Sequence, residues 1–143
     1  MLSKLNRRRY IFQLTAIFSM IFALIGFSYN VWRMEISEYN NTMRTASFEL
    51  LLQLSELEAI VFAAHYDKDP HAGNPRKGWI KVNLINDLSM ITEEEVIASC
   101  ADLKTVWQDH WPQMTDQRES ATRIVEQIDH TRASVRHLLA SLE

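Results

Sequence analysis

Residues 10–32, YIFQLTAIFSMIFALIGFSYNVW, form an uncharged and mostly apolar stretch that constrains this chain more than any other feature. As a helix, the stretch would span roughly 33 Å at about 1.5 Å per residue, and a bilayer core is about 30 Å thick. Tyr10 lies at one end, and Tyr29 and Trp32 lie at the other. Aromatic rings favour the headgroup region at such positions. The sequence therefore predicts one transmembrane helix at 10–32.

The residues before this stretch are basic and indicate its orientation. Residues 1–9 contain no acidic side chain and four basic ones, Lys4, Arg7, Arg8 and Arg9. Because basic residues favour the cytoplasmic side, we expect 1–9 to be a cytoplasmic head and 33–143 to be a periplasmic domain of a bacterial inner-membrane protein. The alternative is a cleaved signal peptide, with Gly26 and Ser28 as small residues before the cut. The helical pattern after residue 32 favours the uncleaved anchor.

Small residues recur along one side of the predicted span, at steps of three, four and three: Ala16, Ser19, Ala23 and Gly26. In lipid, small side chains let helix backbones approach closely. We interpret this side as a candidate packing face for a second transmembrane helix. Ordinary span composition is the competing explanation, because small residues are common in such helices.

Composition limits the partners and the chemistry. Residues 10–143 hold 11 basic and 18 acidic residues, a net charge of −7. An acidic domain is a poor candidate for binding nucleic acid or anionic lipid. Cys100 is the only cysteine, so no internal disulfide can form, and its place on an apolar helical stripe favours burial. None of the three glycines lies in a phosphate-binding motif, and we expect no cofactor.

The segment 33–66 has the pattern of a long helix with a narrow apolar seam. Residues of this seam recur every seven positions: Ile36, Met43, Leu50, Leu57 and Ala64. Such a repeat is typical of a coiled-coil surface, so the seam is a candidate interaction site for a partner protein or a second copy. Since no proline or glycine occurs between Gly26 and Pro70, we expect the span to continue outward as one stalk helix.

The rest of the chain predicts two further helical legs, 79–111 and 114–142, after a break at 67–78 that holds two prolines and two glycines. Residues 79–91 also fit a short strand, but no second strand exists to pair with it. We expect the middle leg to break near Met90–Thr92. Two capping boxes are predicted, Thr92 with Glu95 and Asp116 with Glu119. The fold class is therefore all-α, with one span continuing into an antiparallel helical bundle.

Two clusters could carry chemistry or binding. The first holds two imidazoles and two carboxylates near the break, at His65, Asp67, Asp69 and His71. These are weak candidates for metal ligands, because a polar turn at a hairpin tip has the same composition. The second cluster is Trp107, His110 and Trp111. It could form an aromatic pocket or partner site, although helical spacing alone places both indoles on the core side.

No residue set specifies a reaction, so we expect no enzyme. The sequence favours a non-enzymatic accessory or scaffold subunit of an envelope complex. The alternative is a periplasmic sensor module that binds a small ligand between its helices and regulates a partner protein. The layout resembles the first half of chemoreceptor and sensor-kinase input regions, in architecture only. An inhibitor or immunity-type protein is a third possibility compatible with the net charge.

Overall fold

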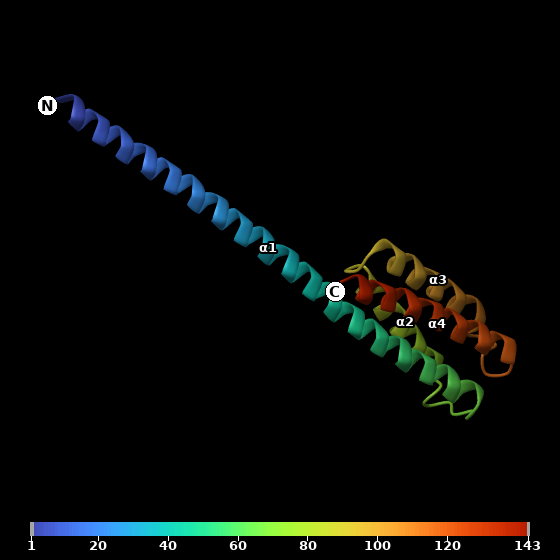
Figure 1. The fold of residues 1–143 in the computed structure, drawn as a ribbon. Coiled ribbons are helices and arrows are strands. Elements are labelled where there is room, and N and C mark those ends of the chain that lie inside the picture. The colour runs from blue at the N-terminus through green and yellow to red at the C-terminus, as the bar shows by residue number, and fades with distance from the viewer. Residues whose placement is uncertain (1, 143) are drawn as a thin grey trace. The chain divides into compact units, whose positions relative to one another are not determined.

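The computed structural model describes residues 2–142, with side chains described from Arg7 onward (Figure 1). These residues form four α-helices and no strand: α1 Leu2–His65, α2 Pro75–Ser89, α3 Glu94–His110 and α4 Arg118–Ser141. The predicted all-helical class is confirmed, and the strand alternative for 79–91 is wrong. The prediction for Lys4 concerns a side chain outside the described part.

The chain divides into two units, residues up to Tyr39 and residues from Asn40 onward, and α1 contributes to both. The first unit consists of α1 alone. The helix is continuous because no proline or glycine follows Gly26 before Pro70, and glycine itself is tolerated in a helix interior at a cost of about 1 kcal/mol. Residues 40–42, which have mediocre helix propensity, are helical as well.

Helix α2 begins four residues earlier than predicted, at Pro75 instead of residue 79. Asn74 caps it, because its side chain accepts a hydrogen bond of 2.9 Å from the backbone N–H of Arg76. Proline is favoured at the first helical position, where its missing N–H is not needed. The predicted break at 67–78 is therefore shorter and covers 66–74, and Gly78 lies inside the helix.

Gly78 faces the ring of Trp107 at very short range. A Cβ built at this glycine would lie 2.2 Å from both Cη2 and Cζ2 of that indole. The glycine therefore lets α2 approach α3, which explains its place in a helix interior.

The predicted break of the middle leg is confirmed, since α2 ends at Ser89 and α3 begins at Glu94. The predicted cap at Thr92 is wrong. Its hydroxyl donates a 2.6 Å hydrogen bond back to the carbonyl of Ser89, so it helps to end α2. Glu93 occupies the N-cap position of α3 without a side-chain hydrogen bond.

The second capping box is also wrong, and α4 begins at Arg118 instead of residue 114. Gln117 is the N-cap residue, again without a side-chain hydrogen bond. Asp116 belongs to the preceding turn, where its N–H donates to the carbonyl of Gln113 at 3.0 Å. Residues 114–116, which the periodicity predicts to be part of the last helical leg, therefore lie in this turn.

In the second unit, residues 40–65 of α1 pack with α2, α3 and α4 around one apolar core (Figure 1). Contacts join α2 to α3 and α3 to α4. At one end, Arg44 donates from Nη2 to the carbonyl of Leu142 at 3.0 Å. At the other end, Nδ1 of His65 lies 2.9 Å from the carbonyl oxygen of Met114. These two contacts make this part of α1 antiparallel to α4.

The core takes large side chains from all four helices and includes the predicted buried cysteine, Cys100. Its members are Met43, Leu50, Leu54, Leu57, Val61, Ala64, Val82, Ile85, Val96, Cys100, Leu103, Trp107, Met114, Ala121, Ile124, Ile128, Val135 and Leu138. Each large buried side chain contributes roughly 1.5–3 kcal/mol relative to an exposed one.

Candidate interaction surfaces

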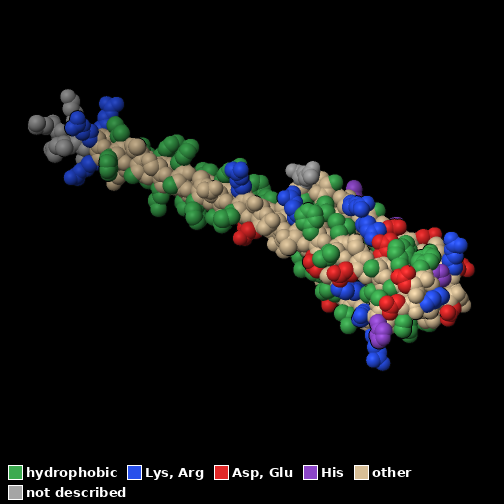
Figure 2. Space-filling view, turned by 90° about the horizontal axis from the view of Figure 1, so that it is seen from below, with side chains coloured by type: hydrophobic (Ala, Val, Ile, Leu, Met, Phe, Trp, Pro, Cys, Tyr) green, Lys and Arg blue, Asp and Glu red, His purple; other side chains and the backbone are tan. Residues whose placement is uncertain are grey.

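The apolar stretch 10–32 is exposed along α1. Its large side chains are all more than two-fifths accessible, from Tyr10 at 63% to Trp32 at 59%. Figure 2 shows hydrophobic side chains along this part of the chain, after a group of basic ones. In length and composition α1 could cross a membrane, and none of its most apolar window is buried. Contiguous exposed apolar surfaces of this kind mark sites that contact a membrane or another protein.

The predicted small-residue face is open in the first unit. A Cβ built at Gly26 would meet nothing within 4 Å. Ser19 and Ala23 line a shallow hollow of about 440 Å³, whose other walls are the rings of Phe18 and Phe22. These rings lie 5.9 Å apart, centroid to centroid. A notch of this kind can accept a side chain of a neighbouring helix, and the packing face stays a prediction.

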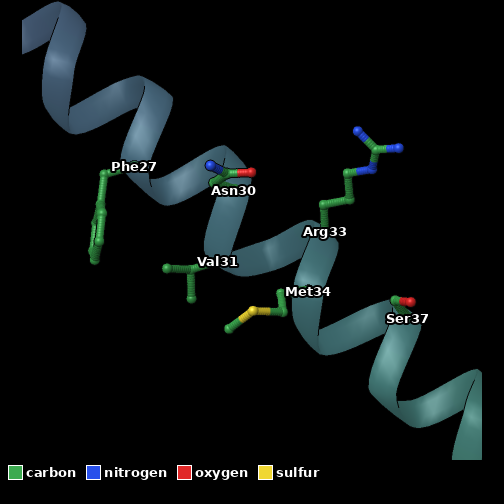
Figure 3. A pocket seen from close by; sticks show the side chains of 6 residues that line it. All are labelled: Phe27, Asn30, Val31, Arg33, Met34 and Ser37. Carbon is green, nitrogen blue, oxygen red and sulfur yellow. The ribbon is translucent and has the colours of Figure 1, made fainter.

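A second hollow, of about 480 Å³, lies at the end of the apolar stretch (Figure 3). All six lining residues belong to α1: Phe27, Asn30, Val31, Arg33, Met34 and Ser37. Figure 3 shows them projecting from successive turns of a single helix. The hollow is therefore an open groove along one helix and does not enclose a ligand.

Most of the predicted stalk seam is covered by the chain itself. Met43, Leu50, Leu57 and Ala64 lie in the bundle core, whereas Ile36, in the first unit, is exposed. The sevenfold repeat correctly marks an apolar face, but over residues 43–64 this face packs against α2, α3 and α4. A partner that binds this part of α1 must use another side of the helix.

The exposed side of α1 in the second unit carries a second apolar stripe that the sequence analysis missed. Its large members are Phe48, Leu52, Phe62 and Tyr66, which are 40–63% accessible. The rings of Phe62 and Tyr66 meet edge to face, with centroids 5.7 Å apart. The signal was present in the sequence as a second set of apolar residues, Phe48, Leu52, Ala59, Phe62 and Tyr66, at steps of four, seven, three and four.

Two ion pairs tie α1 to its neighbours on either side of this stripe. Glu58 accepts a hydrogen bond of 2.7 Å from Arg132 of α4, and Glu56 pairs with Lys81 of α2. Lys81 also donates to Oε1 of Gln53 at 2.8 Å. Since the pair with Arg132 is mostly buried, the loss of one partner would leave an uncompensated charge.

The residues of the aromatic cluster at the end of α3 have different environments. Trp107 is fully buried, and its ring meets that of Trp79 edge to face at a centroid distance of 6.4 Å. The indole Nε1 has no hydrogen-bond partner. Trp111 is partly buried against the core, and Nδ1 of His110 lies 3.3 Å from Oγ of Ser120. The arrangement fits core packing better than an open pocket.

The weak metal candidates lie around the α1–α2 turn and have structural contacts. His65 faces the carbonyl of Met114. Asp69 accepts hydrogen bonds from the N–H groups of His71, at 2.7 Å, and Ala72, at 3.0 Å. These two bonds lower the pKa of the Asp69 carboxyl below its ordinary value. Among the described residues, no three His, Cys, Asp or Glu side chains are placed to hold a metal ion.

A buried polar link between α3 and α4 was not anticipated from the sequence. Ser99 donates to Oγ1 of Thr131 at 3.0 Å, and Thr131 donates to the carbonyl of Gln127 at 2.9 Å. Nδ1 of His130 lies 3.3 Å from Oγ of Ser99. Ser99 is only 4% accessible, so this serine–histidine pair connects the two helices and presents no accessible nucleophile.

Comparisons with protein-family models, with curated proteins and with solved structures found no match to this chain.

Proposed function

We propose that this chain is a non-enzymatic, single-pass membrane protein that serves as an accessory or scaffold subunit of a bacterial envelope complex. Residues 10–32 would cross the inner membrane, residues 1–9 would lie in the cytoplasm, and residues 33–143 would form a periplasmic domain. The observation that carries the proposal is the exposed apolar surface of α1 over residues 10–32. The basic head supports the orientation.

The bundle supports a binding role over a catalytic one. Its titratable side chains near the α1–α2 turn hold turns in place: His65 contacts the carbonyl of Met114, and Asp69 accepts from the N–H of His71. Its outer surface carries large exposed apolar side chains on α1 and α2, including Phe48, Leu52 and Ile80. Clustered apolar side chains on a surface mark sites of protein association.

Anchoring and orientation can be tested with one cysteine variant. Thr122 is exposed on α4, so Thr122→Cys should react with a membrane-impermeant maleimide on intact cells. The wild-type chain is the matched blank, because its only thiol, Cys100, is buried. We expect the labelled chain to stay in carbonate-washed membranes with an intact N-terminus. A soluble chain that begins near Tyr29 would show a cleaved signal peptide, and labelling only after lysis would refute the orientation.

The accessory role requires a stable complex in the membrane. We expect the chain, extracted in mild detergent, to migrate in an assembly larger than one 16.7 kDa copy. Leu52→Glu, on the exposed side of α1, should reduce that assembly without unfolding the bundle. Ile80→Glu, which makes the same kind of change at an exposed apolar position on α2, is the comparison variant for Leu52→Glu. A chain that is monomeric under all extraction conditions would contradict the proposal.

One observation favours the alternative of a ligand-binding sensor. The indole N–H of Trp107 is buried without an acceptor, and such a group costs about 1–3 kcal/mol unless a partner is supplied. A small polar ligand would supply one only from a side of the ring other than that of Gly78, which already lies against Cζ2 and Cη2. A reproducible rise in melting temperature with one member of a small-molecule panel, lost in Trp107→Phe, would support the sensor over the scaffold.

A further inference from the structure

The exposed side of α1 between residues 45 and 66 has the spacing of a coiled-coil seam. Seven exposed residues follow one another at alternating steps of three and four: Thr45, Phe48, Leu52, Ser55, Ala59, Phe62 and Tyr66. We call this set the outer seam. Alternating steps of three and four place side chains along one stripe of a helix that faces a second helix. Tyr66 continues the stripe past the helix end, since its N–H donates to the carbonyl of Phe62 at 2.8 Å.

Two of the three hydroxyl groups on the outer seam, those of Thr45 and Ser55, are already satisfied within α1. Oγ1 of Thr45 donates to the carbonyl of Asn41, and Oγ of Ser55 donates to the carbonyl of Leu51, both at 2.9 Å. A buried donor without an acceptor would oppose association, and neither hydroxyl would become one. The outer seam from Thr45 to Phe62 can therefore be covered by an apolar surface without losing hydrogen bonds.

The sizes of the side chains suit two helices that cross. The middle of the outer seam is small, with Ser55 and Ala59, whereas large side chains lie on either side of it, Phe48 and Leu52 before and the Phe62–Tyr66 ring pair after. Crossed helices are closest at the crossing point and separate toward both ends. Small residues permit the close approach, and the aromatic side chains fill the wider gaps.

We propose that the outer seam binds the outer seam of a second copy of this chain, in parallel, with the helices crossing at Ser55 and Ala59. This inference rests on the proposed anchoring, because two copies inserted through residues 10–32 with the same orientation bring their α1 helices together in parallel. It goes beyond the proposed function by naming the partner and the residues of contact.

The charges beside the outer seam match this parallel register. In a parallel pair, a residue that flanks the seam faces the residue five positions later in the other helix. Arg44 then faces Glu49 of the second copy, and Glu58 faces Ala63. These pairs bring no like charges together.

The two glutamates nearest the middle of the seam are also neutralised within their own chain. Glu56 pairs with Lys81, and Glu58 pairs with Arg132. Approach of a second acidic domain along this side therefore meets ion pairs instead of bare carboxylates. The net negative charge of the bundle does not prevent this particular contact.

Disulfide cross-linking in native membranes tests the proposal with the full-length chain. Ser55→Cys and Phe62→Cys place thiols on the outer seam, Thr122→Cys is the exposed control on α4, and the wild-type chain with its buried Cys100 is the blank. A disulfide needs Cα atoms within about 7 Å, so we expect about tenfold more dimer for Ser55→Cys, at the crossing, than for Thr122→Cys after mild oxidation. Phe62→Cys lies where the helices have separated, and there we expect the same excess with a bis-maleimide that spans the wider gap.

The pattern of cross-links decides among the alternatives. Dimers from both Ser55→Cys and Phe62→Cys support the parallel contact. Dimers from Ser55→Cys alone, with none from Phe62→Cys even when the bis-maleimide is used, overturn it in favour of an antiparallel pair, in which residue 62 no longer faces itself. Yields no higher than those of Thr122→Cys overturn the contact altogether. Adducts with a different polypeptide overturn the homodimer but leave the accessory role standing, whereas a chain absent from washed membranes contradicts the proposed function itself.

Discussion

Gly78→Ala is the substitution for which the structure gives the clearest expectation. Alanine normally stabilises a helix interior over glycine by up to about 1 kcal/mol. Here the added Cβ would lie 2.2 Å from two atoms of the Trp107 ring, whereas carbon atoms in contact lie about 3.5–4.0 Å apart. The ring cannot move away easily, because Trp107 is fully buried and Trp79 lies edge-on against it.

The overpacking term should therefore exceed the helix-propensity term. Overpacking of a core costs about 1–3 kcal/mol, and occasionally more, so we expect a net loss of about 2 kcal/mol in the free energy of unfolding. For a domain of this size, 1 kcal/mol corresponds to about 4–8 °C, which predicts a melting temperature roughly 10 °C lower. Thermal unfolding of the full-length chain in detergent, followed by circular dichroism, measures this.

Two controls separate the clash from other effects of the substitution. In a Trp107→Phe background the clashing atoms are absent, so Gly78→Ala should be neutral or stabilising there. Gly26→Ala makes the same chemical change where a Cβ meets nothing within 4 Å, and it should leave the bundle's melting temperature unchanged. The reasoning would be refuted if Gly78→Ala melted at or above the wild-type temperature, or if its effect were equal in both Trp107 backgrounds.

Other consequences of the structure can be measured by urea unfolding and thiol chemistry. Arg132→Ala should lower the free energy of unfolding by about 1–2 kcal/mol, because it leaves Glu58 mostly buried and unpaired. Arg123→Ala, at an exposed pair, should change it by less than about 0.5 kcal/mol. Equal effects of the two substitutions would contradict this reasoning. Asn74→Ala should cost about 1 kcal/mol by removing the cap of α2, and Asn74→Ser should restore most of it. Burial raises the pKa of the Cys100 thiol from 9.0 to about 11. The stability that the buried, protonated thiol contributes is therefore complete below pH 9. It is lost as the pH rises toward 11, because the thiol of the unfolded chain ionises first. The stability of Cys100→Ala should lack this part of the pH dependence.

The element types were predictable because they follow from patterns along the chain. The continuous helix to His65 follows from the lack of breakers before Pro70, and the turn before α2 contains two of the four predicted breakers, Pro70 and Gly73. The other two, Pro75 and Gly78, lie inside α2. Helix starts were less predictable. Thr92 and Asp116 match the capping-box pattern, yet each is used in the turn that ends the preceding element. Local sequence cannot decide which of two adjacent backbone segments such a residue serves.

Contacts between distant residues were not predictable from one sequence. The close approach of Gly78 to Trp107 depends on how α2 packs against α3. The polar link from Ser99 to Thr131 joins positions 32 residues apart. A serine on a helix favours solvent or a core equally well in sequence terms, and its environment is decided only when the neighbouring helix supplies a matching hydroxyl.

The stalk helix shows why a sevenfold repeat is ambiguous as a functional signal. Residues 43, 50, 57 and 64 repeat every seven positions, and so do residues 48, 55 and 62 on the opposite side of α1. The first set fills the core of the same chain, whereas the second is exposed. A helix that packs on one side in its own bundle and on the other side against a partner needs both sets. Leu57 is buried and Leu52 is exposed, although they share one helix and one side-chain type. Truncation of Leu57 should therefore lower the stability of the bundle, whereas under the proposed association truncation of Leu52 should weaken the dimer. The proposed association along α1 would account for this double pattern, because one set of residues would serve the bundle and the other the partner.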